Sequence, residues 1–450
     1  MSSMQLLPYK QQVSSLLRLG LPIVVGQLGM IILGLADTIM IGHHSTEELA
    51  AAAFVNNVFN LAIIFATGFS YGLTPLIGML QGGGNTQGIG RVFRNALAAN
   101  ASVAVLLTAV MYTVYCFVDK LGQPEELLPH IRPYFVLQLI SLLFIMLFNG
   151  FRQFAEGLTD TRTPMWILLG GNALNIFGNY LLIYGSFGFP EWGLFGAGVS
   201  TLVSRIVMLL VFIGVVAVAR RYKVYREAIL RSRFNRNDFM QLNALGWPIA
   251  LQMGMETAAF SLSAIMVGWL GSIPLAAHQI MISVSTIGIM VYYGMGAALA
   301  VRVSHFMGQK DFSNLRRAVN SGMGIILSLA IVASLFFYLA RTPIIYSFTE
   351  DHEVMVVVSS LIFSLIVYQF GDALQITFAN ALRGTTDVKP MMWIAFFSYF
   401  IVALPVGYLC GFTWGGGVVG VWVAFPAGLF TAGFLFWLRF RYRLQQLMKK

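Results

Sequence analysis

Three carboxylates, Asp37, Glu256 and Asp372, lie in stretches of the chain that are otherwise almost wholly apolar. An ionisable side chain at such depth in a hydrocarbon layer is costly, and it usually marks the path of an ion or a substrate. The whole chain has only 18 acidic residues. These three side chains are therefore the first candidates for chemistry.

Two asparagines accompany the first acid. Asn175 and Asn179 are four residues apart, so they share one face if their stretch is helical. A carboxylate and two amide oxygens are ligands suited to a proton or to a hard cation such as Na+. In the alternative, Asp37 reaches water at a helix end and the asparagines only hydrogen-bond neighbouring helices.

The other two acids form a second candidate group. Asp372 follows Tyr368 by one helical turn, and Glu256 is near the middle of another apolar stretch. Two carboxylates in a low dielectric repel each other, and a shared cation or proton removes that repulsion. The same group could instead bind a cationic organic compound. No basic residue in the apolar stretches of this half is an obvious ion-pair partner.

Three further residues have open roles. Arg205 is the one base well inside a predicted helix, where it balances an acid or reaches toward the surface. His278 lies where we expect a helix to start, as a hydrogen-bonding cap or as a titrating group. Pro22 precedes Asp37 in the same predicted helix. It removes one backbone hydrogen bond and favours a bend, either static or mobile.

The composition indicates a membrane protein. The chain is 58% hydrophobic and 10% charged, whereas a soluble domain has about 25% charged residues. A helical span needs about 20 apolar residues, so roughly a dozen fit into 450 residues. The net charge of +10 is better explained by basic cytoplasmic loops than by nucleic acid. Cys116 and Cys410 are isolated packing residues.

Apolar stretches bounded by Gly, Pro or charge predict twelve transmembrane helices, because backbone inside lipid must satisfy its own hydrogen bonds. The expected fold class is an all-α polytopic membrane protein. The predicted spans are 15–41, 53–80, 93–117, 130–155, 164–186, 193–219, 243–268, 278–303, 317–340, 354–382, 390–412 and 417–440.

The basic residues predict the orientation. Most of the 28 fall in alternate loops and at the two ends, which places both termini in the cytoplasm. The start of the chain has no pattern of a cleaved signal peptide, so we expect the first span to be retained. The acidic clusters Glu47–Glu48, Glu125–Glu126 and Glu350–Asp351–Glu353 fall on the opposite side, where we expect solvated loops.

The chain contains an internal repeat. Leu19–Ile23 recurs as Leu245–Ile249, and Thr163–Met165 recurs as Lys389–Met391, both at the spacing that separates Pro22 from Pro248. A duplicated unit of six helices enters the membrane twice from the same side, so a pseudo-twofold axis along the membrane normal should relate the copies. Parallel repeats of this kind are a transporter architecture. We expect an N-lobe at 1–219, a cytoplasmic linker at 220–242 and a C-lobe at 243–450.

With these features, the chain resembles the multidrug and toxic compound extrusion (MATE) transporters, in particular their NorM branch. The resemblance extends from Leu16 to Arg439. It rests on Gly20-Leu21-Pro22 with Ala36-Asp37, on Asn175 and Asn179, on Gly254-Met255-Glu256, on Leu275 to Gln279, on Tyr368 with Asp372, and on Leu382-Arg383-Gly384 with Asp387 and Pro390.

The resemblance implies an antiporter in the bacterial inner membrane, most simply a monomer. It expels organic, often cationic and amphiphilic drugs or toxic compounds in exchange for Na+ or H+, by rocking two lobes. A cation or proton site of the N-lobe then falls on Asp37, Asn175 and Asn179, and a cation site of the C-lobe on Glu256, Tyr368 and Asp372. Pro22 is tied to bending of the first helix. No cofactor, no metal besides Na+ and no nucleic acid is implied.

Other functions remain as alternatives. A flippase for lipid-linked sugars, or an exporter of a metabolite, has this general fold but often lines its cavity with several basic residues. An enzyme is disfavoured because the six histidines are scattered and mostly in expected loops. An ion channel would show no substrate-dependent ion flux. Gly82-Gly83-Gly84 lacks the pattern of a phosphate-binding loop, which argues against an ATP-driven pump.

Overall fold

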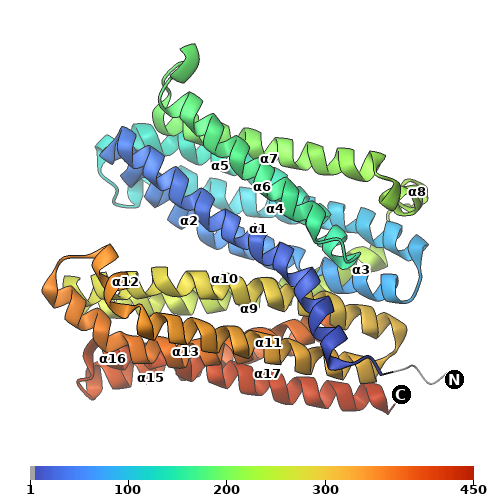
Figure 1. Cartoon of the computed structure of the whole chain (residues 1–450). Coiled ribbons are helices and arrows are strands. Elements are labelled where there is room, and N and C mark those ends of the chain that lie inside the picture. Colours follow the sequence, from blue (N-terminus) through green and yellow to red (C-terminus); the bar gives the residue numbers. More distant parts are fainter. Residues whose placement is uncertain (1–5, 450) are drawn as a thin grey trace. The chain divides into compact units, whose positions relative to one another are not determined.

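The structure is a computed structural model that describes residues 6–449. Within this range all regular structure is helical, and twelve helical stretches are long and apolar enough to cross a membrane. The predicted all-α class and the predicted number of spans are thereby confirmed. Figure 1 shows that the long helices of each half run lengthwise beside one another, with most connections at their ends.

The helices are longer than predicted at most ends, because polar turns at the membrane surface continue them. Their bounds are α1 (Tyr9–His44), α2 (Thr46–Ser70), α3 (Leu73–Gly82), α4 (Thr86–Cys116), η1 (Val118–Lys120), η2 (Glu125–Leu127), α5 (Leu128–Gly157), α6 (Arg162–Ile183), η3 (Ser186–Gly188), α7 (Gly193–Val218), η4 (Arg220–Tyr222), α8 (Lys223–Arg231), α9 (Arg236–Gly268), α10 (Ser272–Gln309), α11 (Phe312–Leu339), α12 (Arg341–Phe348), α13 (His352–Gly384), α14 (Lys389–Phe396), η5 (Phe397–Ala403), α15 (Leu404–Tyr408), η6 (Leu409–Thr413), α16 (Gly417–Trp422) and α17 (Ala424–Met448).

Two predicted spans are not single regular helices. The second is divided at Tyr71 and Gly72 into α2 and α3. A Cβ at Gly72 would lie 2.9 Å from the backbone nitrogen of Gly246, so this break lets two chain segments approach closely. The eleventh contains two stretches of wide π-helix, η5 and η6, on either side of α15. Pro405 in α15 cannot donate a backbone hydrogen bond, which favours such irregular turns.

The chain divides into two compact units. Unit 1 comprises the described residues of Met1–Val24 and Leu251–Lys450, and unit 2 comprises Val25–Ala250. The two boundaries have the spacing of the repeat, because each follows a repeat proline, Pro22 or Pro248, by two residues. Thus α1 and α9 each begin in one unit and end in the other. The predicted boundaries of the N-lobe, linker and C-lobe stay a prediction.

The repeat extends to local backbone geometry. Asn85 accepts a hydrogen bond from the backbone of Gly88 at the start of α4, and Asp311, its counterpart in the repeat, caps α11 in the same way. The residues just before these caps, Gly84 and Lys310, have left-handed φ angles of +70° and +58°. A non-glycine residue adopts this conformation only when its surroundings enforce it, so the same turn was retained in both copies.

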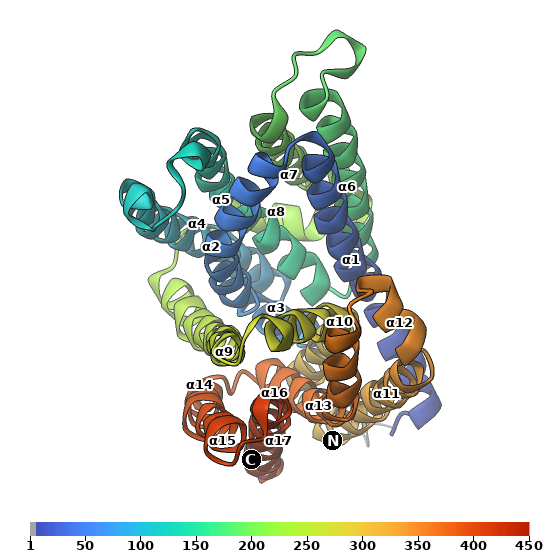
Figure 2. The same ribbon diagram turned by 90° about the vertical axis from the view of Figure 1, so that its left-hand side faces the viewer.

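In unit 1, α13 is the central helix, in contact with α10, α11 and α17 (Figure 2). A buried glycine permits one of these approaches: a Cβ at Gly296 of α10 would lie 2.5 Å from the Asn380 side chain of α13. At one end of the unit, Arg439 of α17 donates two hydrogen bonds, of 2.6 and 3.0 Å, to Asp387. This contact fixes the connection that follows α13.

In unit 2, α5 packs between α4 and α7 (Figure 2). Its aromatic side chains form much of the buried core, including Phe135, which meets Phe59 edge-on at 4.7 Å between ring centroids. The predicted linker is ordered on this unit, because Tyr222 is buried and donates a 2.6 Å hydrogen bond to Asp160. Burial and this carboxylate raise the pKa of Tyr222 above its ordinary value.

Candidate functional site

The first predicted group is assembled in unit 2, and we call it the Asp37 site (Asp37, Asn175 and Asn179). Asp37 lies on α1, seven residues before its end, and the two asparagines lie on one face of α6. Asn179 Nδ2 donates a 2.6 Å hydrogen bond to Asp37 Oδ1. Both asparagines are buried, whereas Asp37 is partly exposed.

One orientation of the second asparagine suits both Asp37 and Thr201. With its amide nitrogen toward Asp37 Oδ1, at 3.0 Å, the oxygen of Asn175 accepts from the Thr201 hydroxyl at 3.1 Å and from the Thr201 backbone at 3.2 Å. The opposite orientation would direct an oxygen at the carboxylate. The carboxylate therefore has two amide donors on one oxygen. The buried oxygen Oδ1 of Asn179 has no partner within the described residues, so it can still accept from a cation or a proton donor.

Arg205 of α7 belongs to the surroundings of the Asp37 site. Its Nη1 donates to Gln138 Oε1 at 3.1 Å and also to the Ser141 hydroxyl. Gln138 in turn donates to the hydroxyl of Tyr134 at 3.1 Å. Arg205 is thus held by neutral oxygens, near enough to Asp37 for the two charges to attract. Both roles considered for it, charge balance and reach toward the surface, stay predictions.

The second predicted group is assembled in unit 1, and we call it the Glu256–Asp372 site (Glu256, Tyr368 and Asp372). Glu256 of α9 accepts two amide hydrogen bonds on Oε2, from Gln252 at 3.0 Å and from Gln375 at 3.1 Å. Asp372 of α13 is only 2% exposed, and its Oδ2 has no hydrogen-bond partner among residues 6–449. The two carboxylates are close enough for their charges to repel.

Several neutral oxygens near these acids also lack partners. They belong to buried side chains, and these oxygens have no hydrogen-bond partner within the described part of the chain: Tyr292 Oη, Gln369 Oε1 and Gln375 Oε1. Gln369 and Asp372 are three residues apart, so they share a face of α13. A buried polar atom without a partner costs free energy, and an oxygen-binding cation would satisfy several of these atoms together.

The aromatic ring of Tyr368 lies in a small cluster. It meets Phe260 at 6.3 Å and Phe425 at 6.4 Å between ring centroids, in both cases edge-on. His278 stacks on the same Phe425 and accepts a 3.2 Å hydrogen bond on Nδ1 from Trp422. His278 is buried six residues inside α10, so the expected position at a helix start is wrong. Accepting on Nδ1 requires the neutral ring, and a titrating role for His278 stays a prediction.

A basic residue does neighbour the second acid group, contrary to expectation. Arg383, expected in a loop, is in the last turn of α13, where it is buried and donates a 2.8 Å hydrogen bond to Gln252 Oε1. Gln252 Nε2 in turn donates a hydrogen bond to Glu256, so Gln252 links Arg383 to this carboxylate. One usable signal for Gln252 was its spacing of four residues before Glu256. Arg383 was missed because α13 extends beyond the predicted span.

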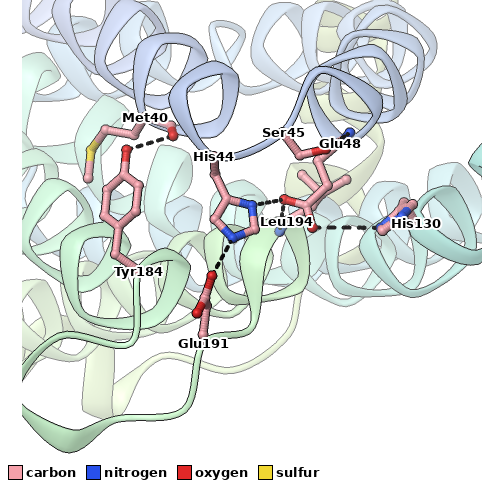
Figure 3. Close-up of polar contacts among 8 residues, drawn as sticks. All are labelled: Met40, His44, Ser45, Glu48, His130, Tyr184, Glu191 and Leu194. Atoms are coloured by element: carbon pink, nitrogen blue, oxygen red, sulfur yellow. Dashed lines mark hydrogen bonds and ion pairs between the residues drawn. The ribbon is translucent and has the colours of Figure 1, made fainter.

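Another expectation was wrong at the end of α1. The pair Glu47–Glu48 was expected in a solvated loop, but Glu48 is only 7% exposed and contacts His44 (Figure 3). Helix α2 begins at Thr46, directly after α1, so Glu48 lies in its first turn and faces the neighbouring helices. Histidines judged too scattered for a site, His44 and His130, both lie beside this carboxylate.

The chemistry available to the two sites is reversible binding of protons or of hard monovalent cations. In residues 6–449 no group of three or more His, Cys, Asp and Glu side chains is arranged to hold a metal ion. Pro22 lies inside the continuous helix α1, within the part of it that belongs to unit 1. Whether α1 bends there during function stays a prediction.

Known proteins resemble this chain over nearly its whole length. The family model described as MatE matches residues 22–181 and again 248–409, so its two matches begin at the two repeat prolines. The Multidrug resistance protein NorM of Photobacterium profundum is 30% identical over 448 residues, covering 96% of each chain.

Solved structures share the fold. A multidrug resistance MATE family transporter of the MOP superfamily, in an outward-facing conformation, aligns with a TM-score of 0.88 at 20% identity over 99% of this chain and 100% of that one. A Vibrio cholerae MATE transporter aligns with a TM-score of 0.87 at 17% identity, over 98% and 99%. The fold, the twelve spans and the doubled family match agree, and this chain is a multi-pass membrane protein of the MATE family.

Proposed function

We propose that this protein is a secondary active exporter that exchanges organic, mostly cationic and amphiphilic compounds for Na+ or H+ by alternating access. The observation that carries the proposal is the Glu256–Asp372 site, where two buried carboxylates lie among oxygens that lack hydrogen-bond partners within the described residues. Such a site is satisfied only when a cation or proton is bound. Membership of the MATE family and the name of the NorM relative support multidrug compounds as the cargo.

The residues of unit 1 have distinct roles in this proposal. Asp372 supplies a carboxylate oxygen that no described protein group neutralises, and Glu256 supplies the second negative charge. Gln369 and Tyr292 contribute neutral oxygens, which suit Na+ better than a proton because a hard cation needs several oxygen ligands. Gly288 permits this arrangement, since a Cβ there would lie 3.2 Å from Gln369 Oε1 and 3.6 Å from Tyr292 Oη.

The Asp37 site has a different role. One partly exposed carboxylate with two amide donors, near the charge of Arg205, has less need of an added cation. We therefore assign proton exchange to Asp37 and Na+ binding to the other group. Release of the ion restores the negative charge of the site. Binding of a cationic compound, or a change to the opposite conformation of the transporter, then becomes favoured.

The location follows from the same proposal. The protein works in the bacterial inner membrane, as a monomer, with both termini in the cytoplasm and without enzymatic activity. A flippase or an exporter of an anionic cargo is the alternative, and it would need basic side chains available to phosphate groups. The buried Arg383 near the Glu256–Asp372 site already donates to Gln252, and the buried Arg152 of α5 pairs with Glu156 at 2.7 Å.

The test uses purified protein in liposomes, with a Na+ gradient and a pH gradient imposed separately. We expect either gradient to drive movement of a fluorescent lipophilic cation, and Asp372→Asn to abolish the response to Na+ while leaving a response to the pH gradient. Asp37→Asn should do the reverse. Full transport by both folded variants would exclude the assignment of the two ions to the two sites. An ion flux that does not depend on the organic cation would indicate a channel.

A further inference from the structure

Four titratable side chains from four segments of unit 2 meet where α1 ends (Figure 3). His44 is the last residue of α1, Glu48 is in the first turn of α2, His130 is in the first turn of α5, and Glu191 lies between η3 and α7. Each of them is seven or more residues along the chain from Asp37. Of the two carboxylates, Glu48 is buried, whereas the side chain of Glu191 is 64% exposed.

His44 is held on both ring nitrogens. Nδ1 lies 2.8 Å from Glu48 Oε2, and Nε2 lies 3.0 Å from Glu191 Oε1. A carboxylate only accepts hydrogen bonds, and a neutral imidazole has one donor nitrogen and one acceptor nitrogen. Both contacts can therefore be hydrogen bonds only when His44 is the imidazolium. We call these three residues, His44, Glu48 and Glu191, the His44 clamp.

Glu48 anchors the clamp to the core of unit 2. It is buried, and its Oε2 also accepts a 2.9 Å hydrogen bond from the backbone of Leu194 at the start of α7. Gly193 makes this approach possible: its φ is +53°, and a Cβ there would lie 2.2 Å from Glu48 Oε1. His130 adds a weaker contact, with Nδ1 at 3.7 Å from the same oxygen.

The clamp acts on the helix that carries Asp37. His44 follows Asp37 by seven residues, two helical turns, so both side chains lie on nearly the same face of α1. Between them, the hydroxyl of Tyr184 donates a 2.7 Å hydrogen bond to the backbone oxygen of Met40, a carbonyl near the end of α1 (Figure 3). The last two turns of α1 are thus attached to α2, α6 and the segment before α7.

We propose that His44 is a positioning residue for Asp37: its imidazolium fixes the end of α1, and loss of its proton releases that end. The clamp is complete at acidic pH and is lost as the pH rises through the titration of His44. The neutral ring keeps one donor, so one carboxylate then faces a lone pair and is repelled. Other ionisable groups around the ring are His43, Glu47, His130 and Tyr184; the first two are exposed.

The proposed effect of the clamp on transport rests on the proposed function of the protein as an exchanger. Protons that reach Asp37 from the same side of the membrane also complete the clamp. Protonation of the ion site and fixation of its helix are then coupled, and an alkaline medium on that side frees α1 to move. The movement itself is measurable without transport, so the clamp and the exchange cycle can fail independently.

The test measures distances between spin labels in the full-length protein in lipid nanodiscs. Labels at two exposed positions, Ile39 on α1 and Phe187 in η3, follow the end of α1, after Cys116 and Cys410 are replaced by serine. Samples at about pH 5 and about pH 9 lie on either side of the ordinary histidine pKa of about 6.5. We expect one distance at the lower pH and a second population at the higher pH.

Matched variants separate the clamp from other titrations. His44→Gln, a neutral side chain, should show the second population at both pH values, with a population ratio changed by about tenfold at the lower pH, since a lost charge-assisted hydrogen bond is typically worth at least that. His44→Arg should show the single distance at both. His43→Gln, the exposed neighbour, should behave as the wild type. A pH response retained in His44→Gln, or absent from the wild type, overturns the proposal.

Discussion

The two acid sites differ although the units that carry them arose by duplication. In the Asp37 site a single carboxylate receives two amide donors on one oxygen, near the half-buried Arg205. In the Glu256–Asp372 site two carboxylates are buried together, and one oxygen of Asp372 has no partner in the described part of the chain. The first site is nearly satisfied by the protein alone, whereas the second is satisfied only by an added positive charge.

The acids of each site have no acidic counterpart at the corresponding positions of the other half of the chain. At the spacing of the repeat, Ser263 corresponds to Asp37, Met30 corresponds to Glu256, and Met146 corresponds to Asp372. The helix caps and left-handed turns, by contrast, recur in both copies. Duplication thus accounts for the scaffold, and each copy acquired its acids separately. This separate origin is compatible with the different ions that we propose for the two sites.

The largest expected difference between the sites is in their response to neutralisation. Asp372→Asn removes a buried charge that has an unpartnered oxygen, so we expect it to stabilise the fold by about 1–3 kcal/mol and to abolish Na+-dependent stabilisation. Asp37→Asn places an amide against two amide donors and should destabilise it. Thermal unfolding with and without Na+ measures both effects. Equal shifts in the two variants would contradict the distinction between the sites.

Much of this arrangement was predictable because membrane insertion makes simple demands on a sequence. The apolar stretches predicted all twelve spans, and the rarity of deep acids identified Asp37, Glu256 and Asp372. Spacing along a helix brought Asn175 and Asn179 to one face, and the structure places them beside Asp37 as expected.

The missed residues are those whose role depends on packing between distant segments. Gln375 and Tyr399 are common residue types in apolar surroundings, and their positions relative to Glu256 depend on how the helices pack. The ends of helices were the other weakness: Arg383 and Glu48 were assigned to solvated loops, yet helical turns extend past the apolar stretches and bury both. Burial of a charged residue near a span end cannot be read from hydropathy.

A smaller effect is expected from the glutamine that links Arg383 to Glu256. Gln252→Leu removes a donor from Glu256 and an acceptor from Arg383, so we expect a loss of about 1–3 kcal/mol in unfolding free energy. A carboxylate with one amide donor fewer has more need of an added cation, so we also expect tighter Na+ binding. Gln279→Leu, at an exposed position of α10, is the matched control. Denaturation in detergent and Na+ titration measure the two quantities, and unchanged Na+ affinity in Gln252→Leu would remove Arg383 and Gln252 from the site.

Substitutions of Arg205 test whether its positive charge lowers the affinity of the Asp37 site for Na+. Arg205→Gln removes the positive charge near Asp37, so a cation at the Asp37 site is no longer repelled, and we expect Na+ to bind there more tightly. The background should be Asp372→Asn, in which the stronger Na+ site is absent. Isothermal titration with Na+ gives the affinity. Arg205→Lys keeps the charge and should bind Na+ as weakly as its parent; tighter binding in that variant too would point to altered packing instead of charge.

The smallest expected difference is in stability, between alanine substitutions at two glycines in the segment from η3 to the start of α7. Gly193 and Gly188 both have left-handed φ angles, but only Gly193 lies against Glu48, and a Cβ at Gly188 would meet open space. Gly188→Ala should cost about 1–2 kcal/mol, the strain of a left-handed alanine. Gly193→Ala has the same strain and also displaces Glu48, so it should cost more and lose the acid-dependent fixation of α1. Equal losses of stability, with the response to pH intact in both variants, would mean that Glu48 is not held through Gly193.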